Sequence, residues 1–385
     1  MIRLLFLLLL LGALAARADE DALQRAFAEG MQAQQAGELS RAESIFRGML
    51  ESTDSPRVKL ELARTLFLQG KYPEAKRLFK DVSLRDETPW RVRDNIALFV
   101  REIEERTGYL KFGFTAVSDS NPGNVARQKE FSIGDLRVTP TEAPKKMSGL
   151  RYSAQGWLPL AAIGSSGYAT ASYVDYPEQD FDRLTVDAGL VRNLTQSGRL
   201  RGKAGLEFGT QGGNGLYRYP YLGLDALLAQ SESSRLAAEL RFGRVLFPDF
   251  DYLDSTYRSA AFSYRHEMSH TVAGTLRATV EGSRAEEKPY SYYGWDFGPG
   301  ISTFWPQYTF LVGASFSVGA RKYAEVDPVF GRRREDERAR AELTVGNKKW
   351  RWRDNYVALV ASVEDTRSNI GFYSYRKSNV SLVVE

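Results

Sequence analysis

The chain has 385 residues, and its 52 Lys and Arg against 48 Asp and Glu give a formal net charge of +4. It contains no cysteine, which excludes disulfides and thiolate metal sites. The basic residues are dispersed apart from Arg332-Arg333-Arg334, so they form no stripe that follows a phosphate backbone, and we expect no nucleic-acid partner. The length allows about two or three ordinary domains, or a small domain followed by a large one.

The first residues have the pattern of a signal peptide. Arg3 supplies a positive charge, Leu4–Leu14 form an apolar stretch, and Ala16-Arg17-Ala18 has the small-x-small form of a cleavage site. The apolar stretch is too short to span a bilayer, so we expect residues 1–18 to be removed and the mature chain to begin at Asp19. No later stretch approaches the ~18 consecutive apolar residues of a transmembrane helix, so a membrane crossing would use β-strands.

Residues from about 20 to 106 are rich in the helix formers Ala, Leu, Glu, Arg and Gln. One pattern occurs there twice at a spacing of 33, as Gly37-x-Leu39-x-x-Ala42-x-x-x-Phe46 and Gly70-x-Tyr72-x-x-Ala75-x-x-x-Phe79. Gly30 and Ala63 fill the same position in each preceding helix, where a small side chain lets two antiparallel helices approach closely. The pattern resembles the tetratricopeptide repeat, whose period is about 34 residues. It predicts a periplasmic tetratricopeptide-like helical domain at residues 19–107.

A further helix is expected after Pro89, with Thr88 as its cap and an apolar face that covers the end of the repeat stack. The residues on that face are Val92, Ile96, Phe99 and Ile103. Tetratricopeptide arrays usually bind peptides in the groove lined by each first helix. Here the groove would carry Gln34, Arg57 and Arg64, which we take as candidate client-binding residues. The alternative is a small helical bundle that binds nothing.

From Tyr109 onward, Gly, Tyr, Ser, Thr and Phe become frequent, and alternation with a period of two replaces the helical period. The clearest strand is predicted at Tyr308–Arg321, where apolar residues alternate with Thr, Gly, Ser and Arg. Successive strands of about 10–14 residues match a tilted crossing of a ~30 Å hydrocarbon layer, whereas the strands of soluble sandwiches are usually shorter. We therefore expect residues 108–385 to form a transmembrane β-barrel.

Aromatic residues cluster near the expected strand ends, which is typical of the girdles at the two membrane interfaces. They are Trp157, Tyr217, Tyr219, Tyr221, Tyr292, Tyr293, Trp295, Trp305, Tyr308, Trp350 and Trp352.

The alternation predicts about 14 strands, an even number that returns both ends of the barrel to the periplasm. Connections on the periplasmic side would be short, as at 196–198 and 306–307, and the two longest, Ser118–Met147 and Lys322–Arg334, would lie outside. The expected strands begin near Tyr109, Ser148, Ser166, Phe181, Arg199, Leu216, Arg235, Tyr252, Thr271, Ser291, Tyr308, Asp336, Asn355 and Phe372.

Two short stretches add a family resemblance to this domain order. They are Ser118-Asp119-Ser120-Asn121-Pro122-Gly123-Asn124, after the first strand, and Ser368-Asn369-Ile370-Gly371-Phe372-Tyr373-Ser374-Tyr375, before the last. With the signal peptide, the repeats and the 14-strand barrel, the chain resembles the surface lipoprotein assembly modulator family of Gram-negative bacteria. The resemblance implies that particular lipoproteins or secreted haemophore-like proteins are helped across the outer membrane, and it carries over no catalytic residue. The chain departs from the usual aromatic barrel ending at Val383-Val384-Glu385.

One motif suggests an enzyme. His266-Glu267-Met268-Ser269-His270 matches H-E-x-x-H, which binds zinc when a helix places both histidines on one face. Strand alternation on both sides of the motif leaves room for a tight turn only, so we expect solvated imidazoles. The Gly-rich run 209–215 lacks a Lys-Ser/Thr ending and is expected to be a loop. Pairs such as Glu239 with Arg241 are expected to form charge ladders that stiffen the barrel interior.

The sequence therefore predicts a fold of N-terminal helices followed by an antiparallel outer-membrane β-barrel, and a function in translocation rather than catalysis. No cofactor, metal or catalytic site is expected. Expected partners are a client lipoprotein or secreted haem- or metal-binding protein, a periplasmic chaperone, the barrel-assembly machinery and outer-membrane lipid. Two alternatives remain: an exopolysaccharide-export porin with periplasmic repeats, and an outer-membrane hydrolase that uses the histidine motif.

Overall fold

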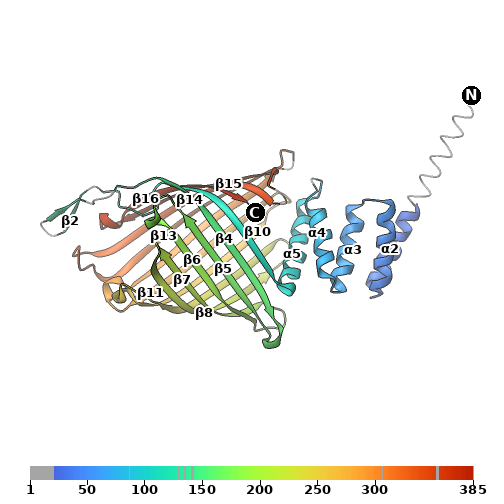
Figure 1. Cartoon of the computed structure of the whole chain (residues 1–385), viewed down its shortest axis with the longest axis horizontal. Helices are drawn as coiled ribbons and strands as arrows, with labels where there is room; N and C mark the ends of the chain where they lie inside the picture. The colour runs from blue at the N-terminus through green and yellow to red at the C-terminus, as the bar shows by residue number, and fades with distance from the viewer. Residues whose placement is uncertain are drawn as a thin grey trace, which may run out of the picture. The chain divides into compact units, whose positions relative to one another are not determined.

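The computed structural model describes residues 21–85, 87–128, 130–133, 136–139, 143–305, 307–352 and 355–384. The chain divides into two compact units, Met1–Thr107 and Gly108–Glu385. The first is helical and the second is built from β-strands (Figure 1). The signal peptide predicted at residues 1–18 lies outside the described residues.

In the described part of the second unit, fourteen antiparallel strands form a closed barrel. Every strand start expected from the sequence lies within three residues of an observed start, so the predicted fold class is confirmed. The strands are β1 (Tyr109–Asp119), β4 (Met147–Leu160), β5 (Ser165–Asp175), β6 (Arg183–Asn193), β7 (Leu200–Gln211), β8 (Asn214–Gln230), β9 (Ser234–Val245), β10 (Ser255–Glu267), β11 (Val272–Ala285), β12 (Tyr292–Trp305), β13 (Phe310–Val326), β14 (Arg333–Trp352), β15 (Asn355–Ser368) and β16 (Tyr375–Val384). Two short strands, β2 (Phe131–Ile133) and β3 (Leu136–Val138), pair in the connection between β1 and β4.

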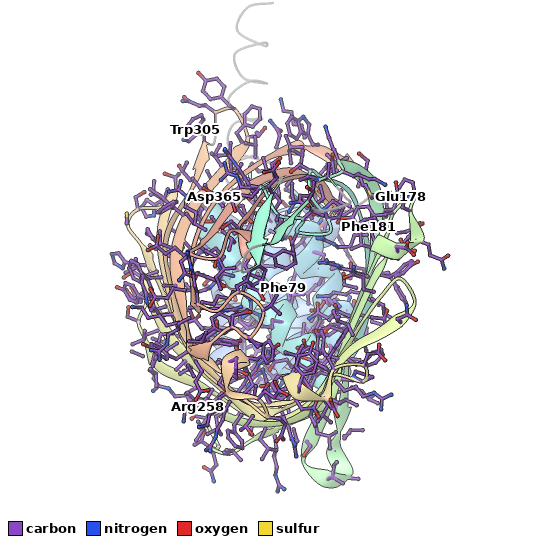
Figure 2. The ribbon with its side chains drawn as sticks, turned by 90° about the vertical axis from the view of Figure 1, so that its left-hand side faces the viewer. Phe79, Glu178, Phe181, Arg258, Trp305 and Asp365 are labelled. Carbon is purple, nitrogen blue, oxygen red and sulfur yellow. The ribbon has the colours of Figure 1, made fainter. Side chains whose placement is uncertain are left out.

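The outer surface of the barrel is largely apolar. Successive side chains of a strand point alternately outward and into the lumen, and most of the large exposed side chains on the outside are hydrophobic. On β9, Leu240 and Phe242 are exposed on the outside, with Phe242 at 58% exposure. Glu239 and Arg241 on the same strand line the lumen. A closed barrel leaves no unpaired strand edge in lipid, and an apolar outer band is what the hydrocarbon layer requires. Figure 2 shows Arg258 and Trp305 on the outside of the wall.

The expected aromatic girdle is wrong in part. Tyr217, Tyr219 and Tyr292 line the lumen instead of facing lipid. On β8 the outward positions belong to the residues between the tyrosines, and Leu222 is 63% exposed there. A cluster of aromatic residues near a strand end gives no information on which side of the wall they lie, because one residue of shift exchanges the two sides.

The two ends of the barrel differ in their connections. We call the end where β1 begins and β16 ends the turn rim, and the opposite end the loop rim. At the turn rim, connections between described strands such as 161–164, 194–199 and 268–271 hold six residues or fewer. At the loop rim, the connections include 120–146 and 246–254. Short turns on one side and longer loops on the other are typical of bacterial outer-membrane barrels.

One expected long loop is shorter than predicted. β13 continues to Val326 and pairs with Arg333, so only residues 327–332 connect it to β14. Residues Lys322–Glu325 were expected to lie in this loop, but Lys322 lies in register with Glu335 and belongs to the strand. Lys322 of β13 lies 3.7 Å from Glu335 of β14, so this part of the hairpin carries opposite charges.

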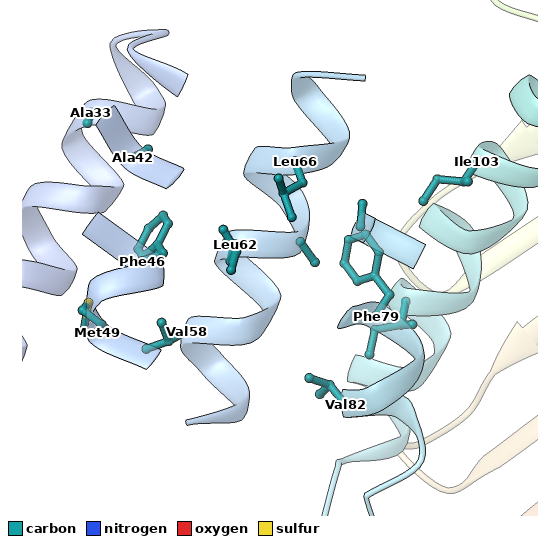
Figure 3. Close-up of a cluster of buried hydrophobic side chains, with 13 residues drawn as sticks. Ala33, Ala42, Phe46, Met49, Val58, Leu62, Leu66, Phe79, Val82 and Ile103 are labelled. Carbon is teal, nitrogen blue, oxygen red and sulfur yellow. The ribbon is translucent and has the colours of Figure 1, made fainter. Parts of the chain in front are cut away.

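The helical unit contains a helix at residues 21–35, followed by α2 (Leu39–Ser52), α3 (Pro56–Leu68), α4 (Tyr72–Ser83) and α5 (Trp90–Thr107). None of its described helices combines the length and apolarity that a membrane-spanning helix needs. Gly37 and Gly70 have φ angles of 78° and 76°, so each closes its turn in a left-handed conformation that favours glycine. Figure 3 shows the buried side chains between the helices. The core comprises Ala33, Ala42, Phe46, Met49, Val58, Leu62, Ala63, Leu66, Ala75, Phe79, Val82, Ile96 and Ile103.

The two repeats pack as their shared pattern predicts. Phe46 lies fully buried against Gly30, where an added Cβ would stand 2.7 Å from the Phe46 ring. Phe79 is buried in the second repeat and stacks on Phe99 of α5 at 5.0 Å between ring centroids. The expected cap by Thr88 is wrong: its hydroxyl donates to the carbonyl of Val82 at the end of α4 instead. Helix α5 covers the end of the repeat stack through its apolar face, because Ile96 and Ile103 belong to the core and Phe99 stacks on Phe79.

Candidate functional site in the barrel lumen and at the loop rim

The lumen contains two pockets with different linings. The loop-side pocket, of about 740 Å³, includes six tyrosines, three arginines and three glutamates in its lining. The turn-side pocket, of about 660 Å³, includes five arginines and three carboxylates in its lining. A charged lining of this kind stays wet, whereas an apolar constriction would favour dewetting and closure.

Ion pairs tie strands of the loop-side pocket together across a strand that lies between them. Arg321 on β13 donates from Nε to Oε1 of Glu281 on β11 at 2.7 Å. Arg241 on β9 donates to Glu239 at 2.7 Å and lies 3.7 Å from Glu207 on β7. The pair of Glu239 with Arg241 that the sequence suggested is therefore present. These contacts stiffen the wall, and each leaves its arginine in reach of a solute in the lumen.

A three-residue hydroxyl–carboxylate cluster joins β5, β6 and β8, and no sequence pattern predicted it. The Tyr221 hydroxyl donates to Asp187 at 3.0 Å, and the hydroxyls of Tyr168 and Tyr221 are 2.5 Å apart. The cluster fits only because Gly205 lies beneath it, where an added Cβ would stand 2.3 Å from the Tyr168 oxygen. The aromatic residues were visible in the sequence, but their meeting depends on the register of three strands.

The barrel closes where β16 meets β1, and we call this junction the seam. Among the described residues the two strands pair over Thr115–Asp119, whereas β1 and β4 pair over the whole of β1. Beyond the strand ends, Ser120 extends the ladder at the loop rim. Its backbone N–H donates to the carbonyl of Ser378 at 3.0 Å, and its hydroxyl accepts from the Ser378 N–H at 2.8 Å.

Asn121, in the first of the two family-like stretches, completes this closure. Its side chain is 1% exposed, and its amide nitrogen donates to the carbonyls of Val125 at 2.9 Å and Arg376 at 3.3 Å. Its oxygen accepts from the Val125 N–H at 2.8 Å. One side chain therefore folds the start of the long loop and attaches it to β16.

The second family-like stretch ties the connection between β15 and β16 to neighbouring strands at the same rim. Asn369 accepts from the backbone N–H of Glu335 and donates to the carbonyl of Arg333 at 2.7 Å. The Tyr373 hydroxyl donates to Asp327 at 2.9 Å, and burial followed by this hydrogen bond raises the pKa of the hydroxyl, which keeps it a donor at neutral pH. Both stretches therefore act at the loop rim, on the two sides of the seam.

The histidine motif does not have the geometry of a zinc protease. His266 and Glu267 end β10 as strand residues, so their side chains point to opposite sides, and Met268–Thr271 form the turn to β11. His266 is half-buried, and its Nδ1 lies 2.8 Å from the Ser234 hydroxyl, which corrects the expectation of a solvated ring. His270 is exposed in the turn. The described residues contain no cluster of His, Cys, Asp and Glu suited to a metal ion.

The three groove candidates of the helical unit have different surroundings. Gln34 is 8% exposed, and its amide donates to the Thr65 hydroxyl at 2.8 Å and to the Glu61 carbonyl at 3.2 Å. Its polar group is therefore engaged between two helices. Arg57 and Arg64 are exposed, and the Arg57 guanidinium lies 4.6 Å from the centroid of the Phe27 ring. The two arginines remain free to meet a partner.

Each of the two units contains a match to a known protein family. Residues 33–91 match the tetratricopeptide repeat, and residues 253–384 match a family described as "Protein of unknown function (DUF2860)". A curated relative, the "Hemophilin secretion modulator" of Acinetobacter baumannii, is 29% identical over 191 residues, which are 42% of this chain. The match spans only 38% of the length of that relative.

Solved outer-membrane structures are similar to the barrel in fold alone. The channel DcaP of Acinetobacter baumannii has a TM-score of 0.42 at 9% identity and covers 73% of this chain and 98% of its own. A bacterial polysaccharide outer membrane secretin has a TM-score of 0.37 at 10% identity, with 73% and 98% covered.

The closed barrel with its apolar exterior and wet lumen defines this chain as an outer-membrane β-barrel protein whose N-terminal tetratricopeptide-like region is periplasmic. The tetratricopeptide match, the secretion-modulator relative and the closed 14-strand barrel agree with the resemblance to the surface lipoprotein assembly modulator family noted from the sequence.

Proposed function

We propose that the protein is an outer-membrane translocation factor that helps specific surface lipoproteins or secreted haemophore-like proteins reach the cell surface. The observation that carries the proposal is the position of the two family-like stretches, which lie on either side of the seam at the loop rim. Asn121 attaches the first stretch to β16, and Asn369 attaches the second to β14. A partly similar relative is named for the secretion of hemophilin, which supports a haem-related client.

The polar lumen supports the same proposal. A polypeptide in transit exposes backbone N–H and C=O groups that hydrocarbon cannot satisfy. A lining of tyrosine hydroxyls, arginines and carboxylates offers these groups partners that exchange readily with water. The helical unit would capture the client beforehand, with Arg57 and Arg64 on its exposed surface.

The proposal is tested by labelling a candidate client at the surface of cells with and without this protein. Genes next to this one that encode a lipoprotein or a haem-binding secreted protein supply the candidates. We expect surface label to fall to background without the protein while total client is unchanged. Equal surface label in both strains would refute the translocation function.

The route is tested by locking the seam with a disulfide, since the chain has no cysteine of its own. Val117→Cys with Ser381→Cys joins registered residues of β1 and β16. Ser153→Cys with Ser172→Cys joins registered residues of β4 and β5 and is the matched control. Export that continues through the oxidised seam variant assigns the route to the lumen. Export lost in that variant alone, and restored by reduction, assigns it to the seam.

A further inference from the structure

Three arginines from three consecutive strands lie next to one another in the lumen. Arg235 on β9 is directly opposite Arg265 on β10. Arg277 on β11 is opposite Ser263, the next lumen-facing position along β10. All three are exposed and line the turn-side pocket. We call them the arginine row.

The arginine row has no direct ion-pair partner in the part of the chain that the structure describes. None of the three forms an ion pair with any residue that the structure describes, although three carboxylates line the same pocket. Those carboxylates are already engaged: Asp296 with Arg338 at 2.8 Å, and Glu342 with Arg340 at 2.8 Å. Like charges directly opposite each other in a sheet destabilise it. The arginine row therefore destabilises the barrel and leaves its positive charge available to a ligand in the lumen.

We propose that the arginine row binds oxyanions that enter the lumen, the carboxylate or phosphate groups that guanidinium forks recognise. A guanidinium presents two parallel N–H donors to an oxyanion. The three guanidinium groups on adjacent strands can contact one oxyanion from the same side of the barrel wall. The turn-side pocket, at about 660 Å³, has room for the anion together with water. This property is independent of the proposed translocation function.

The row also has a defined place along the lumen. Arg235 is the second residue of β9, and Arg265 is the third from the end of β10, so both lie close to the turn rim. An anion that enters from that rim meets the row before it reaches the tyrosine-lined loop-side pocket. The arginine row therefore favours the entry of acidic groups from the turn rim and disfavours the entry of basic groups.

The same three strands provide a matched control on their outer side. Arg244 on β9, Arg258 on β10 and Arg284 on β11 are exposed and point outward, as Figure 2 shows for Arg258. Arg244 pairs with Glu286 at 2.6 Å outside the lumen. Replacing these three arginines removes the same formal charge from the same strands without altering the lumen.

The experiment measures equilibrium binding of two probes to the detergent-solubilised full chain at low salt: radiolabelled inorganic phosphate, and a fluorescent hexaglutamate peptide, with hexalysine as the negative probe. The variants are the lumen set (Arg235→Gln, Arg265→Gln, Arg277→Gln) and the outer set (Arg244→Gln, Arg258→Gln, Arg284→Gln). We expect the wild type and the outer set to bind alike. Each lumen arginine removed should weaken binding about tenfold, the scale of a hydrogen bond to a charged group.

Binding of phosphate alone assigns the row to free oxyanions, and binding of the peptide alone assigns it to carboxylates carried on a chain. No binding of either probe to the wild type, or binding unchanged in the lumen set, overturns the proposal. The single variant Arg265→Gln guards against misfolding of the triple variant. Because it removes a like-charge contact, it should keep the heat-modified gel mobility of a folded barrel at wild-type temperatures or above.

Discussion

Replacement of Asn121 by alanine should loosen the loop-rim end of the seam. The side chain is 1% exposed and makes the three hydrogen bonds described above. Its removal leaves the Val125 N–H and the carbonyls of Val125 and Arg376 without that partner. At about 1 kcal/mol for each hydrogen bond, the local stability should fall by about 2–3 kcal/mol.

Such a change is measured by amide hydrogen exchange of the full chain in detergent. The N–H groups of Ser120 and Ser378 report on the seam, because each donates across it. A loss of about 2–3 kcal/mol in local opening should accelerate their exchange by about 30- to 150-fold, while the amides of β9–β11 are unaffected. Asn193→Ala, at an exposed asparagine that ends β6, is the control. If Asn121→Ala leaves the exchange of both serine amides at the control rate, the seam does not depend on this side chain.

Three further changes test the helical unit and the histidine motif. Gly30→Val should reduce the thermal stability of the helical unit by about 1–3 kcal/mol, seen as an earlier loss of ellipticity at 222 nm, because the new side chain meets the Phe46 ring; an unchanged transition would mean that the helices separate freely. The hydrogen bond from Lys71 lowers the pKa of Glu43 to about 2, so this carboxylate stabilises the unit above pH 4.5 and its contribution disappears as the pH falls toward 2. Lys71→Met should lower the free energy of unfolding of the helical unit by about 1–2 kcal/mol at pH 6 and make it less dependent on pH between 4.5 and 2. The same pH dependence of unfolding in the wild type and the variant would contradict this. His266→Ala should leave client export intact, and loss of export together with stoichiometric bound zinc in the wild type would revive the hydrolase alternative.

The strands could be predicted because their pattern is local. Each strand must present one apolar side to lipid and one polar side to water, so a period of two fixes its position within a few residues. The same argument failed at Lys322–Glu325, where Lys, Tyr, Ala and Glu give no regular alternation of apolar and polar residues. It also failed for Tyr217 and Tyr219, since an aromatic side chain suits a membrane interface and a lumen equally well.

The contacts that define the candidate site could not be predicted, because they depend on register. The sequence shows that Arg235 and Arg265 lie on polar sides of their strands, but only the pairing of β9 with β10 brings them opposite each other. Pro122-Gly123 predicts a turn and says nothing of the burial of Asn121 beside it. Gln34 was read as a groove residue from its helix position, but its amide donates to the Thr65 hydroxyl on α3 and is buried there.

The hydrogen bond from Asn121 to the Arg376 carbonyl joins positions 255 residues apart in the chain. It can form only after the last strand has arrived beside the first, so it is absent from every partly assembled state of the barrel. Until then the Arg376 carbonyl lacks this donor and stays hydrated at the rim. The Asn121–Arg376 hydrogen bond is therefore present only in the closed barrel. A protease or a labelling reagent directed at the start of the long loop would distinguish closed barrels from open ones.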